Sequence, residues 1–207
     1  VSTIIDWVNR NRPYGEGYWL DSWNSYSLSI RVVVWMQQYA QREAAIDADN
    51  KNMIRRSLLA QMRFLRSNME VDIGGNHLIK NIKALLWASK FFDGKEAESW
   101  YVLGRKLLKR EIEEQITVDG MHYELSPAYH AQVFADLLDC YVVCDAADHK
   151  FIEDILRKMA QNLADMTHPD GMVSLFNDSG LHMTYQPAEC LDVFHRLGLG
   201  NIHANSV

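Results

Sequence analysis

The sequence predicts an all-α protein built from antiparallel helical hairpins. Apolar residues recur at intervals of three and four in nearly every segment of the 207 residues, whereas the strict alternation typical of strands is almost absent. Apolar residues make up 48% of the chain and charged residues 23%, which is the balance of a globular protein. About eight helical patterns follow one another with short connections, and this is typical of stacked helical hairpins.

The first 70 residues of the chain contain three predicted helices, over residues 3–9, 23–42 and 50–68. The second of them has an apolar interior, Leu28–Met36, which predicts burial on several sides. Arg31 lies inside this run and needs a partner, either a buried carboxylate or an anionic ligand. The third helix has a basic face, which we interpret as a solvated surface.

Further helices are predicted over residues 77–92, 97–116, 128–147, 151–166 and 187–197. Ser126 and Pro127 open the helix over 128–147, because serine caps helices and proline suits their first turn. Residues 173–176 are the one plausible short extended piece, and residues 198–207 are predicted to fray.

The helix over 77–92 follows a Gly74-Gly75 break and has two different sides. At about 100° per residue, one side is aliphatic, and the opposite side carries Asn76, Lys80, Lys83 and Trp87. One interpretation is structural, with Asn76 as the N-cap and the lysines in solvent. The other is functional, because an amide, cations and an indole together suit a sugar that carries a carboxylate.

The segment 119–130 is the most unusual stretch of the chain. After the turn signal Asp119-Gly120 it places these side chains within nine residues: His122, Tyr123, Glu124, Ser126, Tyr129 and His130. Tyrosine can give or take a proton, histidine titrates near neutrality, and unpaired N–H groups in the first turn of a helix favour anions. The alternative is an ordinary polar loop whose tyrosines pack and whose hydroxyls are satisfied locally.

Composition excludes several classes of protein and site. A net charge of -6 argues against a general nucleic-acid binder, and no apolar run approaches the ~20 residues that cross a bilayer. The three cysteines suggest buried thiols rather than a disulfide framework. The eight histidines form no zinc-protease pattern, so we expect no metal site and no cofactor in this chain.

Taken together, these motifs resemble the helical domain of the heparinase II/III-like polysaccharide lyases. The matching stretches are Trp23–Arg31, Gly75–Leu78, Asp119–His130, and Asp170-Gly171 with Asn177-Asp178-Ser179. They occur in the family's order and cover nearly the whole chain. The resemblance implies a single domain over 1–207 with the fold of an incomplete α/α toroid. It also implies β-elimination on an acidic, uronate-containing polysaccharide, such as the glycosaminoglycan heparan sulfate, or alginate.

The resemblance also implies roles for individual residues. Tyr129 is the expected catalytic tyrosine, with Tyr123 as its rival, and Asn76 with His77 is expected to neutralise the substrate carboxylate. His122, Glu124 and His130 are expected to orient Tyr129 or to bind sugar hydroxyls, and Tyr123 to pack or to bind substrate. The other expected contacts with substrate are stacking of sugar rings on Trp23, Tyr26 and Trp87, and binding of anionic groups by Lys80 or Arg31.

Two departures from the family pattern matter. Family members continue into a β-sandwich domain that supplies further active-site groups, so we expect this chain to be a fragment whose C-terminal partner domain is absent. The family's glycine-aspartate turn reads Asn177-Asp178 here. The lyase interpretation implies a periplasmic or secreted protein. The alternative is a carbohydrate-binding or structural toroid without catalysis.

Overall fold

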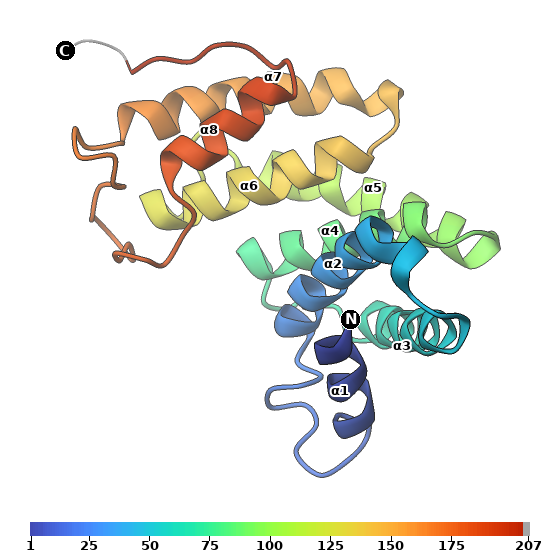
Figure 1. Ribbon diagram of the computed structural model, residues 1–207. Helices are drawn as coiled ribbons and strands as arrows, with labels where there is room; N and C mark the ends of the chain where they lie inside the picture. Colours follow the sequence, from blue (N-terminus) through green and yellow to red (C-terminus); the bar gives the residue numbers. More distant parts are fainter. Residues whose placement is uncertain (205–207) are drawn as a thin grey trace. The chain divides into compact units, whose positions relative to one another are not determined.

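The computed structural model describes residues 1–204, and the regular elements in this part of the chain are helices joined by loops (Figure 1). It forms eight α-helices and one short 3-10 helix: α1 (Ser2–Arg10), α2 (Ser25–Arg42), η1 (Glu43–Ala45), α3 (Ala48–Ser67), α4 (Gly75–Phe91), α5 (Lys95–Gln115), α6 (Pro127–Val143), α7 (Ala146–Asp165) and α8 (Pro187–Arg196). Extended pairing among these residues is confined to two isolated bridges, Ile116 with His122 and Thr167 with Val173. None of the described helices is both long enough and apolar enough to span a bilayer.

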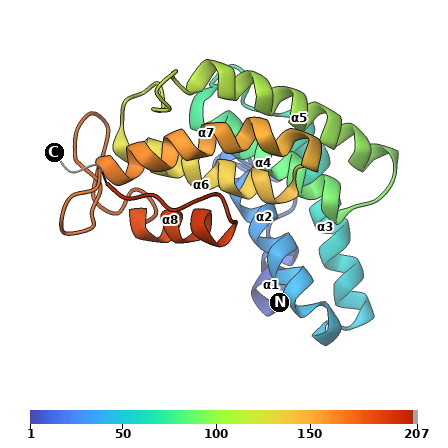
Figure 2. The same cartoon turned by 90° about the horizontal axis from the view of Figure 1, so that it is seen from above.

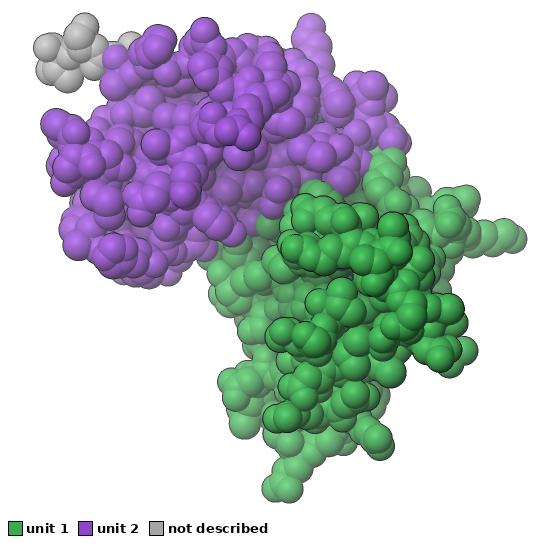
Figure 3. All heavy atoms as spheres, viewed as in Figure 1, with its two compact units in different colours: residues 1–105 green, residues 106–207 purple. Residues whose placement is uncertain are grey.

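The helices group into two compact units, residues 1–105 and residues 106–207, which are coloured separately in Figure 3. Unit 1 contains α1 to α4 and the first half of α5. Unit 2 contains the second half of α5 and helices α6, α7 and α8.

Unit 1 is organised around α2, which packs against α3 and α4. Leu28, Val32 and Met36 of α2 are buried, as the apolar run predicts, but Ile30 and Val34 lie on an exposed side of the same helix. The core continues through aromatic side chains: Trp23 lies 5.2 Å from Phe64 between ring centroids.

The start of α4 differs from the sequence prediction. Its N-cap is Gly74, with φ 69° and ψ -148°, and Asn76 lies inside the first turn. Glycine has no Cβ and adopts this conformation at low cost, so the chain turns before Asn76. The capping role predicted for Asn76 is therefore wrong. Asn24 and Asp47 do cap α2 and α3, by accepting hydrogen bonds from the N–H groups of Ser27 and Asn50.

Unit 2 is organised around α6, which packs against α7 and α8 (Figures 1 and 2). The spacing of Phe134, Leu137, Leu138 and Tyr141 predicts that they face the core; the first three are buried and Tyr141 is half-buried. Helix α6 ends at Val143, four residues earlier than predicted, because Cys144 is extended and Asp145 takes the N-cap position of α7. The three cysteines are free thiols and buried, as predicted.

The turn between α5 and α6 requires glycine at position 120. Gly120 has φ +91°, and a Cβ added to it would meet the Lys158 Cβ at 2.3 Å. Asn162 and Lys158 of α7 donate hydrogen bonds to the carbonyls of Asp119 and Val118, at 2.8 and 2.9 Å. The turn is therefore fixed on α7, and it sets where the following segment begins.

The end of the described chain is anchored, contrary to the predicted fraying. Leu199 is buried, and its N–H donates to the Phe194 carbonyl at 3.3 Å. Gln161 donates to the His203 carbonyl at 3.0 Å. The Gln161 side chain of α7 and the Phe194 backbone carbonyl of α8 thus hold residues 203 and 199, and residues 205–207 lie outside the described part of the chain.

Candidate active site

In unit 1 the candidate residues gather at the start of α4. His77 and Asn76 lie in its first turn, and the His77 ring stacks on Tyr26 of α2 with centroids 4.4 Å apart. The His77 Nδ1 atom lies 3.0 Å from Oε1 of Glu70, and the His77 side chain is 38% exposed. A carboxylate only accepts, so Nδ1 carries the proton and the other ring nitrogen, Nε2, is left for a ligand.

Glu70 is held in turn by Asn81, one helical turn beyond His77. The Asn81 Oδ1 atom accepts from the Glu70 N–H at 2.8 Å, and Nδ2 donates to Glu70 Oε2 at 2.9 Å. Asn81 also donates to the Ser29 hydroxyl at 3.1 Å. Glu70 is buried, so this network fixes the carboxylate and, through it, the ring of His77.

The Asn76 side chain is half-buried and makes no hydrogen bond to any described residue. An amide has two N–H donors and one carbonyl oxygen, so all of these groups are available for hydrogen bonds with a ligand. Asn76 and His77 therefore offer neighbouring polar groups from one turn of one helix, as the functional interpretation of this turn requires.

The other residues of unit 1 that were predicted to bind sugar lie deeper than expected. Trp23 is 3% exposed and Lys80 is 4% exposed, with the Lys80 Nζ atom 5.6 Å from the Tyr26 ring. Trp87 is half-buried and packs against the core. The predicted stacking of a sugar on Trp23 is wrong because its ring is inside the core. The buried Lys80 likewise offers no surface for substrate anions.

Arg31 has a partner of a kind that the sequence did not indicate. Its Nε donates to Gln61 Oε1 at 2.7 Å, and its guanidinium lies 4.0 Å from the centre of the Trp7 ring. Burial lowers the pKa of Arg31 to about 10. The predicted carboxylate partner is therefore wrong, because an amide and an indole take that place.

In unit 2 both histidines of the 119–130 segment are fully buried. The His130 Nε2 atom donates to the Met159 carbonyl at 2.9 Å, and Nδ1 accepts from the His122 N–H at 3.3 Å. This pattern fixes a neutral ring, and burial lowers the pKa of His130 to about 4. His130 therefore ties the segment to α7, and its burial favours the predicted orienting role over contact with sugar hydroxyls.

His122 is fixed by a relay from α5. Gln115 donates from Nε2 to Glu111 at 2.7 Å, so its Oε1 accepts from the His122 Nε2–H at 3.2 Å. The His122 Nδ1 atom is buried and has no hydrogen-bond partner among the described residues. Burial, and then the neighbouring His130, lower the pKa of His122 to about 4. For His122, too, burial favours the predicted orienting role over contact with sugar hydroxyls.

We expect this buried histidine pair to make the protein acid-sensitive. The folded pKa values of about 4 lie below the ordinary 6.5, so the unfolded chain binds protons first as the pH falls. The contribution of the two neutral, buried histidines to the free energy of unfolding is complete above pH 6.5. It is lost as the pH falls toward 4, by up to about 1.4 kcal/mol per pH unit for each histidine. Urea midpoints at pH 7 and about pH 5.5 measure the loss, and equal midpoints would contradict it.

The two tyrosines of the segment remain accessible. Tyr123 is 47% exposed, and its ring lies 4.8 Å from that of His122. Burial and then the neighbouring Glu124 raise the pKa of Tyr123. Tyr129 is half-buried in the first turn of α6, and its hydroxyl makes no hydrogen bond to any described residue. Tyr129 thus has a hydroxyl that is free to exchange a proton with a ligand.

The backbone at the start of α6 is not an anion site. Pro127 has no N–H, the Ala128 N–H donates to the Ser179 hydroxyl at 3.0 Å, and the Tyr129 N–H donates to the Ser126 hydroxyl at 3.3 Å. The Ser126 cap was predicted from the sequence and is confirmed. The unpaired N–H groups expected there are absent, because Ser126 and Ser179 satisfy them.

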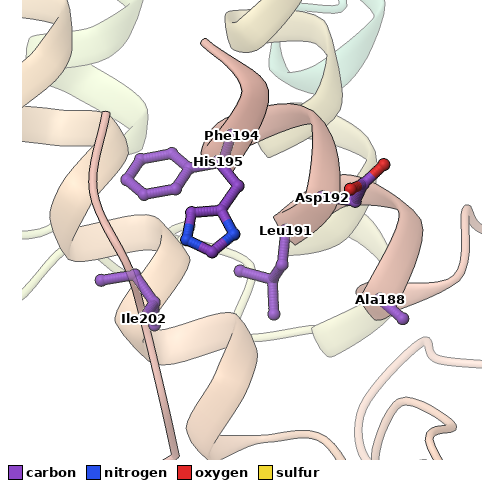
Figure 4. A pocket seen from close by; sticks show the side chains of 6 residues that line it. All are labelled: Ala188, Leu191, Asp192, Phe194, His195 and Ile202. Atoms are coloured by element: carbon purple, nitrogen blue, oxygen red, sulfur yellow. The ribbon is translucent and has the colours of Figure 1, made fainter. Parts of the chain in front are cut away.

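One hollow in unit 2 lies away from all these residues (Figure 4). It has a volume of about 240 Å³ and is lined by Ala188, Leu191, Asp192, Phe194, His195 and Ile202. None of the candidate residues lines it, so it contributes nothing to the site. Among the described residues, no three or more His, Cys, Asp or Glu side chains gather where they would hold a metal ion.

Residues 1–195 match the family model of the heparinase II/III N-terminus. The chain belongs to this family. Among its relatives, a heparin-sulfate lyase of Bacteroides thetaiotaomicron is 28% identical over 194 residues, which cover 86% of this chain and 28% of the relative. A heparin-sulfate lyase of Bacteroides stercoris is 32% identical over 114 residues, which cover 52% of this chain and 17% of the relative.

Solved structures share the fold. A crystal structure of heparinase III superposes with a TM-score of 0.75 and 22% identity, covering 95% of this chain and 32% of that chain. A heparan sulfate lyase from Pedobacter heparinus gives a TM-score of 0.64 and 22% identity, covering 86% of this chain and 29% of that one. The predicted all-α class and α/α toroid fold of the heparinase II/III family are confirmed. The chain spans about 28% of the length of the first of these relatives.

Proposed function

We propose that this chain is the helical part of a polysaccharide lyase that cleaves a uronate-containing glycosaminoglycan by β-elimination. The observation that carries the proposal is the accessible Asn76 and His77 pair, with His77 oriented by Glu70. The names of the relatives support heparan sulfate as the first substrate to test. The activity belongs to a longer protein in this proposal, because the chain spans about 28% of such a relative.

The chemistry follows from the acidity of the substrate. The proton on C5 of a uronate is held tightly because the adjacent carboxylate is already negative. Asn76 donates its amide N–H groups to that carboxylate, and His77, protonated on both ring nitrogens beside Glu70, donates from Nε2–H, so that the charge that develops on proton removal is stabilised. The C5–H electron pair forms the C4=C5 double bond, the C4–O bond breaks, and the leaving oxygen takes a proton.

Tyr129 transfers the proton in this proposal. A phenol can act as the acid toward the leaving oxygen or, once deprotonated, as the base toward C5. Tyr26, stacked on His77, lies where a sugar ring approaches that histidine. The reaction takes no metal or other cofactor from this chain. A polymeric substrate of this kind lies outside the cytoplasm, so we also propose a periplasmic or secreted location.

The test uses the full-length protein and a set of polymers: heparan sulfate, heparin, chondroitin sulfate and alginate. Each is incubated with the protein, and the ultraviolet absorbance of the unsaturated uronate is followed. A rise in absorbance with heparan sulfate supports the proposal. A rise with alginate alone would change the proposed substrate from a glycosaminoglycan to alginate. Binding without cleavage of any polymer would favour a carbohydrate-binding domain instead.

Glu70→Gln is expected to lower kcat by about ten- to a hundredfold. The substitution keeps the size of the side chain but removes the charge that holds His77 Nδ1–H, and a hydrogen bond to a charged group contributes about 1.5–3 kcal/mol. Steady-state kinetics measure the loss. Glu98→Gln, on the exposed side of α5 in unit 1, is the matched control and should keep wild-type kinetics. Equal rates in both variants would leave Glu70 without a role in orienting His77.

A further inference from the structure

The loop between α7 and α8 lies beside the start of α6 and is bonded to it (Figures 1 and 2). Asn177 donates from Nδ2 to the Leu125 carbonyl at 2.6 Å. The Ser179 hydroxyl lies 2.9 Å from the Ser126 hydroxyl and accepts from the Ala128 N–H at 3.0 Å. Three bonds from two residues thus hold the four-residue stretch that comes immediately before Tyr129.

That stretch needs to be held. Leu125 has φ 53°, a left-handed conformation that costs a branched side chain free energy and persists only where the surroundings enforce it. Its own N–H donates to the His122 carbonyl at 2.9 Å, and its carbonyl is the acceptor for Asn177. The turn at Leu125 sets the orientation of the first turn of α6, and therefore that of the Tyr129 ring.

Asn177 also accounts for the departure from the family's glycine-aspartate turn. It has φ 53°, and asparagine is among the few residues other than glycine that adopt this conformation readily. A glycine at this position has no side chain and could not make the bond to Leu125. The substitution therefore keeps the turn and adds a hydrogen bond to the candidate catalytic segment.

We propose that Asn177 and Ser179 are positioning residues that fix Tyr129 for proton transfer, acting through Leu125, Ser126 and Ala128. This inference rests on the proposed lyase function for its kinetic consequence. Neither residue touches the substrate in this account. Asn177 and Ser179 lie 51 to 53 positions further along the chain than the residues of 125–128 that they bond to. The local sequence around Tyr129 therefore does not indicate their role.

The kinetic test compares Ser179→Ala with Ser174→Ala in the full-length protein. Ser174 lies in the same loop, but its hydroxyl donates to the Met166 carbonyl just after α7. Ser179→Ala is expected to lower kcat by about ten- to a hundredfold, as a small misplacement of a reacting group does, with KM changed less than about twofold. Ser179→Thr keeps a hydroxyl and should recover most of the rate.

Asn177→Gly provides an independent arm. Glycine tolerates the positive φ, so this variant removes only the amide that bonds to Leu125. We expect a smaller fall in kcat than for Ser179→Ala, because one bond is lost instead of two. If Ser179→Ala and Asn177→Gly both matched Ser174→Ala in kcat, the positioning role would be overturned.

Amide hydrogen exchange separates failure of this inference from failure of the lyase proposal. In Ser179→Ala the Ala128 amide loses its acceptor, so its exchange is expected to accelerate whether or not the protein cleaves any polymer. A wild type that cleaves nothing while Ala128 exchange accelerates in the variant would reject the lyase proposal and keep the structural link. Unchanged exchange at Ala128 would reject the link itself.

Discussion

Tyr129→Phe is expected to lower lyase turnover by about a thousandfold while the protein stays folded. The ring and its packing are kept, and only the hydroxyl is removed. General acid–base catalysis contributes about 10²–10⁴-fold, and no other group in this chain is assigned the proton transfer. The hydroxyl makes no hydrogen bond to any described residue, so the free energy of unfolding should change by less than about 0.5 kcal/mol.

The matched control for this experiment is Tyr123→Phe. Tyr123 lies six positions earlier in the same segment and is 47% exposed, so the substitution removes an equivalent phenol from the same surroundings. We expect less than a tenfold fall in kcat. Thermal melts of both variants check that each is folded. If Tyr129→Phe kept the wild-type rate and Tyr123→Phe did not, the proton-transfer role would pass to Tyr123.

Features of the chain that depend on local chemistry were predictable from the sequence. The helices follow from the recurrence of apolar residues, and Ser126 with Pro127 marks the start of α6 because a cap acts on residues only two or three positions away. The buried side of α6 is also predictable from local spacing, because Phe134, Leu137 and Leu138 lie on one side of the helix.

Features that depend on contacts between distant segments were not predictable. The indole of Trp23 points into the core because Phe64, 41 positions later, lies against it. Arg31 contacts Gln61 and Trp7, which no spacing rule connects with it, and its buried Nη2 has no hydrogen-bond partner among the described residues. The burial of His122 and His130 likewise depends on α5 and α7, which supply Gln115 and the Met159 carbonyl.

Glu70 is the functional candidate that the sequence analysis missed. It lies in the connector before α4, where an acidic residue has no obvious meaning, and its role follows from bonds to His77 and Asn81. The available signal was the spacing of His77 and Asn81, four positions apart on one helix, because residues at that spacing share a side. A polar pair at this spacing indicates that both side chains bond to one shared group, but it does not identify that group as the Glu70 carboxylate.

Asn76→Ala is expected to lower kcat by about a hundredfold or more without destabilising the protein. If Asn76 donates to the substrate carboxylate, its loss resembles the loss of one oxyanion donor, which costs about 10²–10³-fold. The structure separates this effect from stability, because the N-cap of α4 is Gly74 and not Asn76. Alanine has a higher helix propensity than asparagine, so the free energy of unfolding should stay equal or rise slightly, by about 0.5 kcal/mol.

Two further variants make this expectation specific. Asn52→Ala, in the second turn of α3, removes an exposed asparagine and should leave the rate unchanged, with a similar small rise in stability from the helix propensity of alanine. Asn76→Asp keeps the shape but places a negative charge where the substrate carboxylate binds, so its rate should fall at least as far as that of Asn76→Ala. A loss of about 1 kcal/mol in stability with an unchanged rate would show that Asn76 serves the helix and not the substrate. Because rate and stability are expected to move in opposite directions in Asn76→Ala, one pair of measurements decides between the two roles.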